Sequence, residues 1–318
     1  MDYSRRRFMT AVSAFLAAIN VRHLSADESV TELSADESNF HYIYGNEAYR
    51  NDFYRFLTNV FHLQPEADLH RLIKEVTAQH ANDRDIYIEL HRQIGSIRPF
   101  FSELTYGLPA LARQKQVIAA QTTRLLPEKP YHEGYLEVGS TGRYFDSLEE
   151  ALEISGERYF LGPVPATYSV PDMIDRGQIA KAGTFIDLHY YQSQLGAVIP
   201  DNSLDLATVY IGFHHCPIEL REEFITSIRD TLKPGASMIL RDHDVHNEPM
   251  WKMVALAHDV FNMGTNESWA YNQDELRAFY SLDTLDAMLR RYGFISDGVK
   301  LYQAGDPTLN ALMLYKKA

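Results

Sequence analysis

The chain has 318 residues, 45% of them apolar, which is enough to bury one large core or two moderate ones. Its 30 lysines and arginines against 43 aspartates and glutamates give a net charge of −13, which disfavours a partner held by phosphate neutralisation, so we expect no nucleic-acid partner. The single cysteine, Cys216, excludes an internal disulfide and a cysteine-rich metal site, and a cytoplasmic location is therefore expected.

Residues 4–20 suggest an alternative location. Their sequence, Ser-Arg-Arg-Arg-Phe-Met-Thr followed by an apolar run, resembles a twin-arginine export signal. The apolar run is short, however, no Ala-x-Ala cleavage site follows, and Arg22 and His23 interrupt the region where cleavage would fall. These departures favour a basic amphipathic helix. No later segment reaches the roughly 20 apolar residues that cross a bilayer, so we expect no stable membrane span.

The first part of the chain divides into a tail and a helical region. The string Leu-Ser-Ala-Asp-Glu-Ser occurs at residues 24–29 and again at 33–38, which indicates a duplicated polar linker within an N-terminal segment at 1–40. A docking motif presented twice is the alternative. Residues 41–130 carry apolar residues at helical spacing, and we expect an α-helical cap or lid domain there. Pro65 suits the first turn of a helix, and further helices are predicted near Ile86–Ile94, Phe100–Tyr106 and Ala110–Leu125.

Residues 131–318 change to short apolar runs that alternate with helical segments. The fold class predicted from this alternation is α/β, a Rossmann-like, mainly parallel seven-stranded sheet with a C-terminal antiparallel hairpin, preceded by the helical N-terminal domain. The predicted strands are Tyr135–Val138, Arg158–Leu161, Thr184–Ile186, Leu204–Ile211, Ala236–Arg241, Ile295–Tyr302 and Ala311–Tyr315. The predicted helices are Tyr144–Ile154, Pro171–Gly177, Pro217–Leu232, Pro249–Asn262 and Thr284–Tyr292.

Ligands of an open α/β sheet bind outside the carboxyl ends of its strands, so the loops there are the first to consider. The turn after the first strand reads Glu-Val-Gly-Ser-Thr-Gly-Arg-Tyr at 137–144. Its glycines would let backbone amides approach a ligand that the following helix N-terminus also faces. A purely structural strand-to-helix turn is the alternative for this segment taken alone.

Further segments follow in a particular order. Ile186-Asp187 precedes Pro200-Asp201-Asn202-Ser203-Leu204-Asp205, and Leu232-Lys233-Pro234-Gly235 comes after both. Over about residues 133–318 this series resembles the class I S-adenosylmethionine-dependent methyltransferase family. The resemblance implies S-adenosyl-L-methionine as cofactor, with the turn beside its methionine part, Asp187 near the adenine amine, and Val209 to Gly212 below the methyl group. The cofactor-binding residues expected from it are Glu137, Gly139, Ser140, Thr141, Gly142, Asp187, Leu188, Ile211 and Gly212.

Two features depart from the family's pattern. Thr141 stands where a further glycine is usual, or the loop is one residue short. The second strand lacks the acidic residue that normally binds the ribose hydroxyls, because it runs into Gly-Pro-Val-Pro at 162–165. Ribose recognition would then need Tyr168, Ser169 or Asp172, or the cofactor would bind weakly.

Histidines near the expected methyl group are candidate bases, because a protonated nucleophile needs one. His215 follows the fourth strand, where a structural hydrogen-bonding role is the alternative. His243 and Asp244 follow the fifth strand, and a carboxylate beside a histidine can orient it and keep it basic. Asp242 and Asp244 could also bind a divalent cation, cap a helix or pair with Arg241. We therefore expect His215, His243 and Asp244 as catalytic residues and assign no metal ligands.

The leading hypothesis is a methyltransferase for a small-molecule acceptor, with O-, N- or C-methylation left open. A non-catalytic or regulatory relative with weakened cofactor binding is the alternative, and a nicotinamide-dependent enzyme is a third, disfavoured by the hairpin and the Lys-Pro-Gly segment. Aromatic residues, among them Trp269, Tyr271, Phe279 and Tyr280, are expected to cover the acceptor or to lie in the core. The remaining partner expected is a second copy of the chain in a homodimer.

Overall fold

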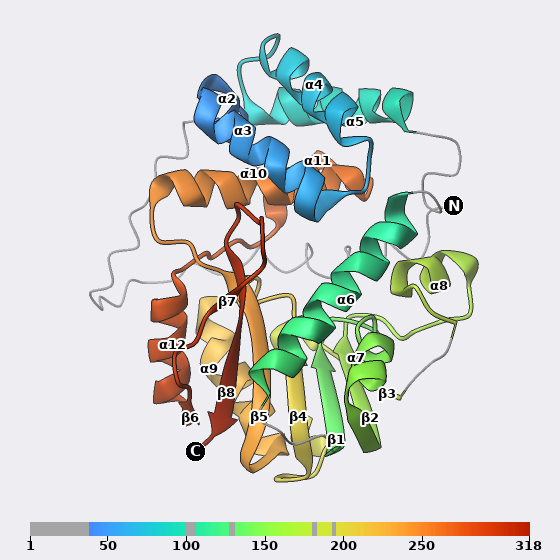
Figure 1. Cartoon of the computed structure of the whole chain (residues 1–318), viewed down its shortest axis with the longest axis vertical. Coiled ribbons are helices and arrows are strands. Elements are labelled where there is room, and N and C mark those ends of the chain that lie inside the picture. Colours follow the sequence, from blue (N-terminus) through green and yellow to red (C-terminus); the bar gives the residue numbers. More distant parts are fainter. Residues whose placement is uncertain (1–37, 99–105, 127–130, 180–182, 193–194) are drawn as a thin grey trace.

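The computed structural model describes residues 38–98, 106–126, 131–179, 183–192 and 195–318. Among these residues eight strands form one sheet in the order β3-β2-β1-β4-β5-β8-β6, with β7 also paired to β8 (Figure 1). None of the described helices combines the length and apolar character that crossing a membrane requires. The strands are β1 (Tyr131–Val138), β2 (Glu153–Gly162), β3 (Thr184–Asp187), β4 (Leu204–Val209), β5 (Leu232–His243), β6 (Phe294–Ile295), β7 (Leu301–Tyr302) and β8 (Asn310–Lys317).

The direction of the strands confirms the predicted fold class. Strands β1 to β5 pair in parallel, whereas β8 runs antiparallel to β5, β6 and β7. The prediction of one strand at Ile295–Tyr302, and hence of seven strands in all, is wrong. A tight turn divides that segment, because Gly298 has φ +78° and its amide donates to the Ser296 hydroxyl, while the Val299 amide donates to Asp297. Two short strands therefore replace the single long one.

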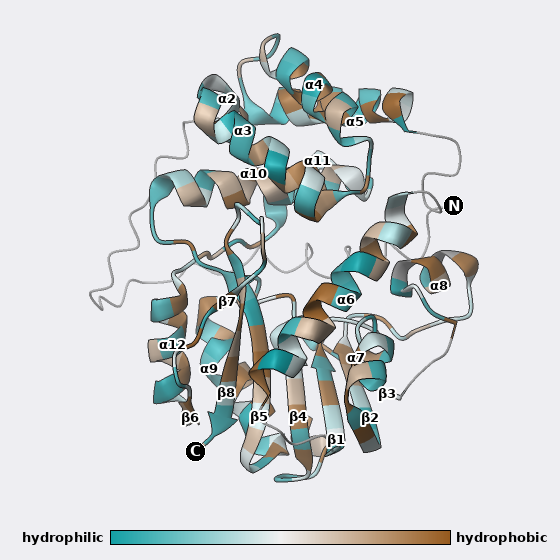
Figure 2. Cartoon of the chain, viewed as in Figure 1, coloured by the Kyte–Doolittle hydropathy of each residue, from teal (hydrophilic) through white to brown (hydrophobic). Residues whose placement is uncertain are grey.

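The sheet has a core on each face, because successive residues of a strand point to opposite sides. On one face Leu136 and Val138 pack with α9 (Arg221–Thr231) and α12 (Leu282–Arg291). On the other face Tyr135 packs with α6 (Leu108–Leu125) and α7 (Phe145–Ala151). Brown, apolar residues run along the strands between these helices in Figure 2. The helix α8 (Val170–Arg176) and short 3₁₀ turns at His189–Tyr191, Leu195–Ala197 and Ile218–Leu220 complete the connections.

A layer of helices lies beyond the carboxyl ends of the parallel strands (Figure 1). It contains α2 (Asn39–Gly45), α3 (Glu47–Phe56), a π-helical turn at Leu57–Phe61, α4 (Glu66–Thr77) and α5 (Asp83–Ile97). Asparagine side chains cap two of these helices, Asn46 at α3 and Asn82 at α5, as their short polar groups favour. Pro65 lies one residue before α4, close to the predicted first turn.

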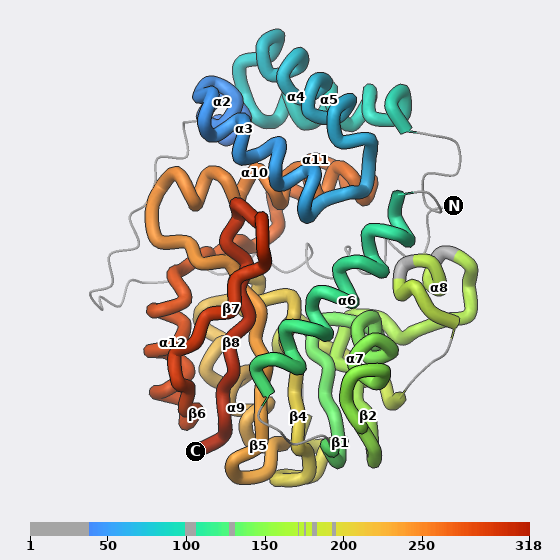
Figure 3. Tube along the Cα trace, in the orientation of Figure 1, coloured from blue at the N-terminus to red at the C-terminus, as the bar shows by residue number. Residues whose placement is uncertain are grey.

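The core of this helical layer includes one helix from the distant end of the chain. Met253, Leu256, Ala257, Val260 and Met263 of α10 (Glu248–Gly264) pack with the buried residues of α2 to α5. The tube in Figure 3 shows the orange α10 beside the blue helices, with α11 (Trp269–Asp274) nearby. We call α2–α5 with α10 and α11 the cap. The helix α6, by contrast, packs on the sheet, and the division of the chain at residue 130 stays a prediction.

Several predicted features lie outside the described residues. These are the export-type segment, nearly all of the duplicated polar string, and most of the helix expected at Phe100–Tyr106.

Candidate functional site

The turn after β1 requires its two glycines. Gly139 and Gly142 have φ of +87° and +84°, in the region that only glycine adopts readily. A Cβ atom on Gly139 would also lie 2.2 Å from the Cδ1 atom of Ile211. The turn therefore packs directly against the loop after β4, and the flexible side chain of Ile211 covers Gly139.

The carboxyl group of Glu137 supports this turn from within. Its side chain is fully buried and accepts hydrogen bonds from the Tyr135 hydroxyl at 3.0 Å, the Tyr144 amide at 3.2 Å and the Ser140 hydroxyl. Burial raises the pKa of Glu137, against these hydrogen bonds. The Ser140 oxygen in turn accepts from the amides of Gly142 and Arg143. Glu137 and Ser140 thus fix the shape of the turn, and direct contact with a ligand stays a prediction for both.

The loops after β1, β2 and β3 are joined at one edge of the sheet. The amide of Gly139 donates to the carbonyl of Leu161 at 2.7 Å, and the amide of Leu188 donates to the next carbonyl, that of Gly162, at 2.8 Å. The structure therefore brings the predicted residues Asp187 and Leu188 to the same end of the sheet as the glycine turn. Asp187 is exposed, and its Oδ1 atom accepts from the His189 amide at 2.8 Å.

The residues suggested for ribose recognition are largely engaged elsewhere. The Ser169 hydroxyl caps α8 by accepting from the Asp172 amide, and the Asp172 carboxylate accepts from the Thr167 amide and lies 3.5 Å from the Arg176 Nε atom. Tyr168 is 64% exposed. Ser169 and Asp172 therefore stabilise α8, and ribose recognition by Tyr168, Ser169 or Asp172 stays a prediction.

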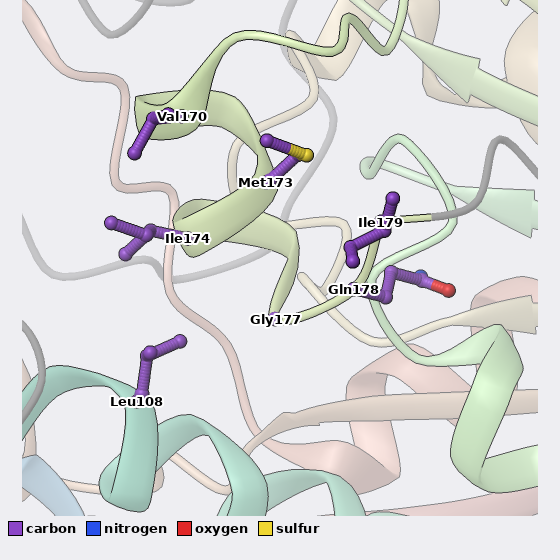
Figure 4. Close-up of a pocket in the computed structure, with 7 residues that line it drawn as sticks. All are labelled: Leu108, Val170, Met173, Ile174, Gly177, Gln178 and Ile179. Carbon is purple, nitrogen blue, oxygen red and sulfur yellow. The ribbon is translucent and has the colours of Figure 1, made fainter.

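An apolar pocket of about 240 Å³ lies between α6 and α8. In Figure 4 the side chains of Leu108 and Ile174 approach each other across it, and Gln178 lies at one side. The Gln178 amide group donates to the carbonyl of Gly142, so this wall of the pocket is bonded to the glycine turn. The lining residues are Leu108, Val170, Met173, Ile174, Gly177, Gln178 and Ile179.

The carboxylate of Asp242 organises the ends of β4 and β5. It is buried and accepts from the Phe213 amide at 3.0 Å, His214 Nδ1 at 2.6 Å, the His243 amide at 2.8 Å and the Tyr280 hydroxyl at 2.6 Å. Burial alone would raise the pKa of Asp242, but the charge of His214 and the hydrogen bonds from His214 and Tyr280 lower it well below its usual range. Asp242 is thus an ionised anchor for four groups.

Gly212 is needed beside this anchor. Its φ is +75°, and a Cβ atom there would lie 2.7 Å from the Asp242 carboxylate. Ile211 and Gly212, both predicted as site residues, therefore lie between the glycine turn and Asp242.

Four histidines gather beside Asp242. The ring of His214 lies 4.1 Å from that of His215, 5.2 Å from that of His258 and 5.7 Å from that of His243, measured between centroids. The ring of Phe279 lies 5.2 Å from both His214 and His258. We call His214, His215, His243 and His258 the histidine cluster. Phe279 thus contacts the cluster, whereas Trp269 contacts Tyr87 in the cap.

The two predicted bases in this cluster are weakly basic. His215 Nδ1 lies 3.0 Å from the carbonyl oxygen of Leu276, and His243 Nδ1 lies 2.9 Å from that of Thr308. Burial lowers the pKa of each to about 4. Both imidazoles are therefore neutral at pH 7, with their Nδ1 atoms held by the backbone.

Asp244 does not orient His243. It accepts from the Leu282 amide at 2.9 Å and from the Tyr302 hydroxyl, and it lies 3.4 Å from the Lys300 ammonium. Successive residues at a strand end point to opposite sides, which separates Asp244 from its neighbour. The expected histidine–carboxylate pair is instead His214 with Asp242.

A buried ionic network lies beside the histidine cluster, and the sequence alone does not predict it. Arg277 donates to Glu275 at 2.8 Å and to Asp259 at 2.7 Å. Glu275 lies 3.5 Å from His258 Nδ1 and 4.0 Å from His215 Nδ1. His258, Asp259, Glu275 and Arg277 come from α10 and the segment after α11, so only tertiary packing brings them to this site. The one local signal of this network in the sequence is Asp259, a charged residue within an otherwise apolar helix.

Cys216, next to the cluster, should be chemically inert in the folded protein. It is fully buried, and burial raises the pKa of its thiol to about 12. Because the thiolate is the reactive form, we expect no reaction with Ellman's reagent under native conditions and one thiol per chain in guanidinium chloride. Rapid reaction of the native protein would contradict this prediction.

Comparisons with known proteins bear on the whole chain. No family model and no curated protein matches it. Similar solved structures include the mitomycin 7-O-methyltransferase MmcR (13% identity, 80% of this chain and 69% of that chain, TM-score 0.45) and the CurJ carbon methyltransferase (14%, 80% and 67%, TM-score 0.46). A third is the 1,6-didemethyltoxoflavin-N1-methyltransferase of Burkholderia thailandensis (12%, 75% and 92%, TM-score 0.42). The chain's own strand order, with five parallel strands followed by antiparallel β8, gives residues 131–318 a Rossmann-like α/β fold.

Proposed function

We propose that the protein is an S-adenosylmethionine-dependent methyltransferase that acts on a small-molecule acceptor. The observation that carries this proposal is the glycine turn at Gly139–Gly142, bonded to the end of β2 and placed at the same edge as Asp187. Loops at the carboxyl ends of parallel strands are where such sheets bind ligands. Small-molecule methyltransferases among the solved structures agree with this proposal.

The residues present fit part of the cofactor. The exposed carboxylate of Asp187 suits an exocyclic adenine amine, which needs an acceptor, and Leu188 supplies an apolar surface beside it. The glycine turn with Ser140 and Thr141 would hold the methionine part, and Ile211 and Gly212 would line the path to the methyl group. Glu137 would act through the shape of the turn. The ribose has no dedicated carboxylate in the described residues.

When bound, the cofactor supplies a methyl group already activated by the sulfonium. The chain itself would supply position and a route for a proton. The histidine cluster follows β4 and β5, so His215 or His243 would lie near the acceptor and accept its proton at Nε2. With a pKa of about 4, each would assist only weakly, and positioning would supply most of the acceleration. Asp244 would fix the end of β5 through Leu282 and Tyr302.

Calorimetric titration with S-adenosylmethionine or S-adenosylhomocysteine tests the proposal. We expect binding by the full chain, and a dissociation constant raised about 10- to 100-fold by Asp187→Ala, because a hydrogen bond to a charged group is lost. Asp201→Ala is the matched control, since Asp201 is also exposed but precedes β4 at the opposite end of the sheet. The control should bind like the unsubstituted chain.

Different outcomes would contradict different parts of the proposal. No heat and no thermal shift at millimolar cofactor would overturn the methyltransferase assignment and favour the non-catalytic relative, which the engaged Ser169 and Asp172 also favour. Normal binding by Asp187→Ala would overturn only the adenine contact. A thermal shift with NAD but not with S-adenosylmethionine would favour the nicotinamide-dependent enzyme instead.

A further inference from the structure

Three members of the histidine cluster have the arrangement of metal ligands. One ring nitrogen from each of His214, His215 and His258 lies within 4.8 Å of the corresponding atom of the other two. His214 and His215 follow β4, whereas His258 comes from the middle of α10, more than 40 positions later. The fold thus brings three imidazoles from two separate elements to one point.

The Nδ1 atom of each of these rings faces a protein acceptor. His214 Nδ1 bonds to Asp242 at 2.6 Å, His215 Nδ1 to the Leu276 carbonyl at 3.0 Å, and His258 Nδ1 lies 3.5 Å from Glu275. A ring whose Nδ1 hydrogen is donated in this way offers the lone pair of its Nε2 atom. Histidines that bind metals almost always have their second nitrogen held by a carboxylate or a backbone carbonyl, as these three do.

The Nε2 atom of His214 gives independent support. His214 is 3% exposed, and its Nε2 atom is buried without a hydrogen-bond partner among the described residues. Buried polar atoms are nearly always satisfied, so an orphaned one points to a bound ion or water. Because His214 belongs to this group of three, a partner bound to its Nε2 atom would also lie close to the rings of His215 and His258.

The electrostatics suit a cation. The carboxylates of Asp242 and Glu275 lie beside the Nδ1 atoms of His214 and His258 and add negative charge near the site. The basic side chain of Arg277 is already paired with Glu275 and Asp259.

We propose that His214, His215 and His258 bind one divalent transition-metal ion, with zinc as the first candidate, through their Nε2 atoms. Imidazole ligands select zinc, copper, iron or nickel, whereas magnesium and calcium require oxygen ligands. A Zn–N bond of about 2.1 Å in a tetrahedral site needs nitrogens about 3.4 Å apart, so the rings, whose nitrogens lie within 4.8 Å of one another, would have to move closer when the ion binds.

Three protein ligands leave a fourth position open, as in catalytic zinc sites. His243, whose ring centroid lies 5.7 Å from those of both His214 and His258, borders the site. The proposal rests only on these residues and not on methyl transfer. With zinc on its Nε2 atom, His215 would no longer accept a proton, and that role in the proposed methyl transfer would be left to His243.

Titration of the full chain with zinc sulfate, after removal of metal with a chelator, tests the site. We expect one ion per chain with a dissociation constant below roughly 1 μM, and cobalt(II) should give the visible absorption of a four-coordinate site. His215→Gln and His258→Gln should each weaken zinc binding by about 100-fold or more. His41→Gln, an exposed histidine of α2, is the control and should bind zinc like the unsubstituted chain.

Failure of the unsubstituted chain to bind zinc, cobalt, nickel, copper or iron(II) would overturn the proposal without any variant. Unchanged binding in both His215→Gln and His258→Gln, with circular dichroism showing that they fold, would overturn it as well. Cofactor titration of the same metal-free protein separates the two proposals. Zinc binding without S-adenosylmethionine binding overturns only the methyltransferase, and the reverse result overturns only the metal site.

Discussion

Replacing Asp242 by alanine is expected to lower the free energy of unfolding by about 3–5 kcal/mol. The substitution leaves four donors without their acceptor, namely the Phe213 and His243 amides, His214 Nδ1 and the Tyr280 hydroxyl. Each unsatisfied buried group costs about 1–3 kcal/mol, so the loss comes mainly from desolvated partners. Denaturant unfolding followed by circular dichroism, in chelator-treated buffer, measures the effect.

A graded series controls this experiment. Tyr280→Phe removes one donor and leaves the carboxylate in place, so a loss of about 1 kcal/mol is expected. Asp242→Asn keeps the shape of the side chain and should fall between the two. A change below 1 kcal/mol for Asp242→Ala would show that Asp242 is not the anchor of the ends of β4 and β5.

Replacing Arg277 by methionine should also cost about 3–5 kcal/mol of unfolding free energy, although methionine keeps much of the side-chain volume. The arginine is the buried cation between Asp259 and Glu275, and without it two carboxylates remain buried and uncompensated. Burial already raises the pKa of Asp259, against the charge of Arg277, which shows how strongly that site disfavours an unpaired anion. Thermal and denaturant unfolding would both report the loss.

The control is Arg290→Met, because the pair of Arg290 and Asp286 has the same chemistry on the surface, where the arginine side chain is 44% exposed. Exposed pairs contribute about 0–1 kcal/mol. The double variant Arg277→Met with Asp259→Asn should recover part of the stability, since only the carboxylate of Glu275 then remains without its arginine partner. Equal, small losses for Arg277→Met and Arg290→Met would refute the assignment.

The features that local sequence predicts are those set by neighbouring residues. The glycine turn followed from an apolar run ending in Gly139 and Gly142, and the structure gives both the positive φ that such a turn requires. Strand directions followed from the alternation of strands and helices. The prediction of one strand at Ile295–Tyr302 is wrong for a local reason too, because a Ser-Asp-Gly turn interrupts the apolar residues on either side of it.

The candidate metal site was beyond such reasoning. His258 lies in α10, a helix whose extent was predicted almost correctly at Pro249–Asn262. Periodicity identifies the buried faces of a helix, but it does not say what each face contacts. In α10 one face packs with α2 to α5, and Val254 and Ala255 pack with Val245 and Phe279 on another. Only that double packing brings His258 to His214.

The same helix sets an order of events during synthesis. The helices α2 to α5 share their core with Met253, Leu256 and Val260, which lie more than 150 positions further along the chain. A nascent chain that has emerged only as far as α5 therefore exposes part of that apolar surface. Contacts of such long sequence separation form late and slowly, because a long loop must close first. The cap, although its first four helices precede the sheet in the sequence, is completed only after β1 to β5 and α10 have been made.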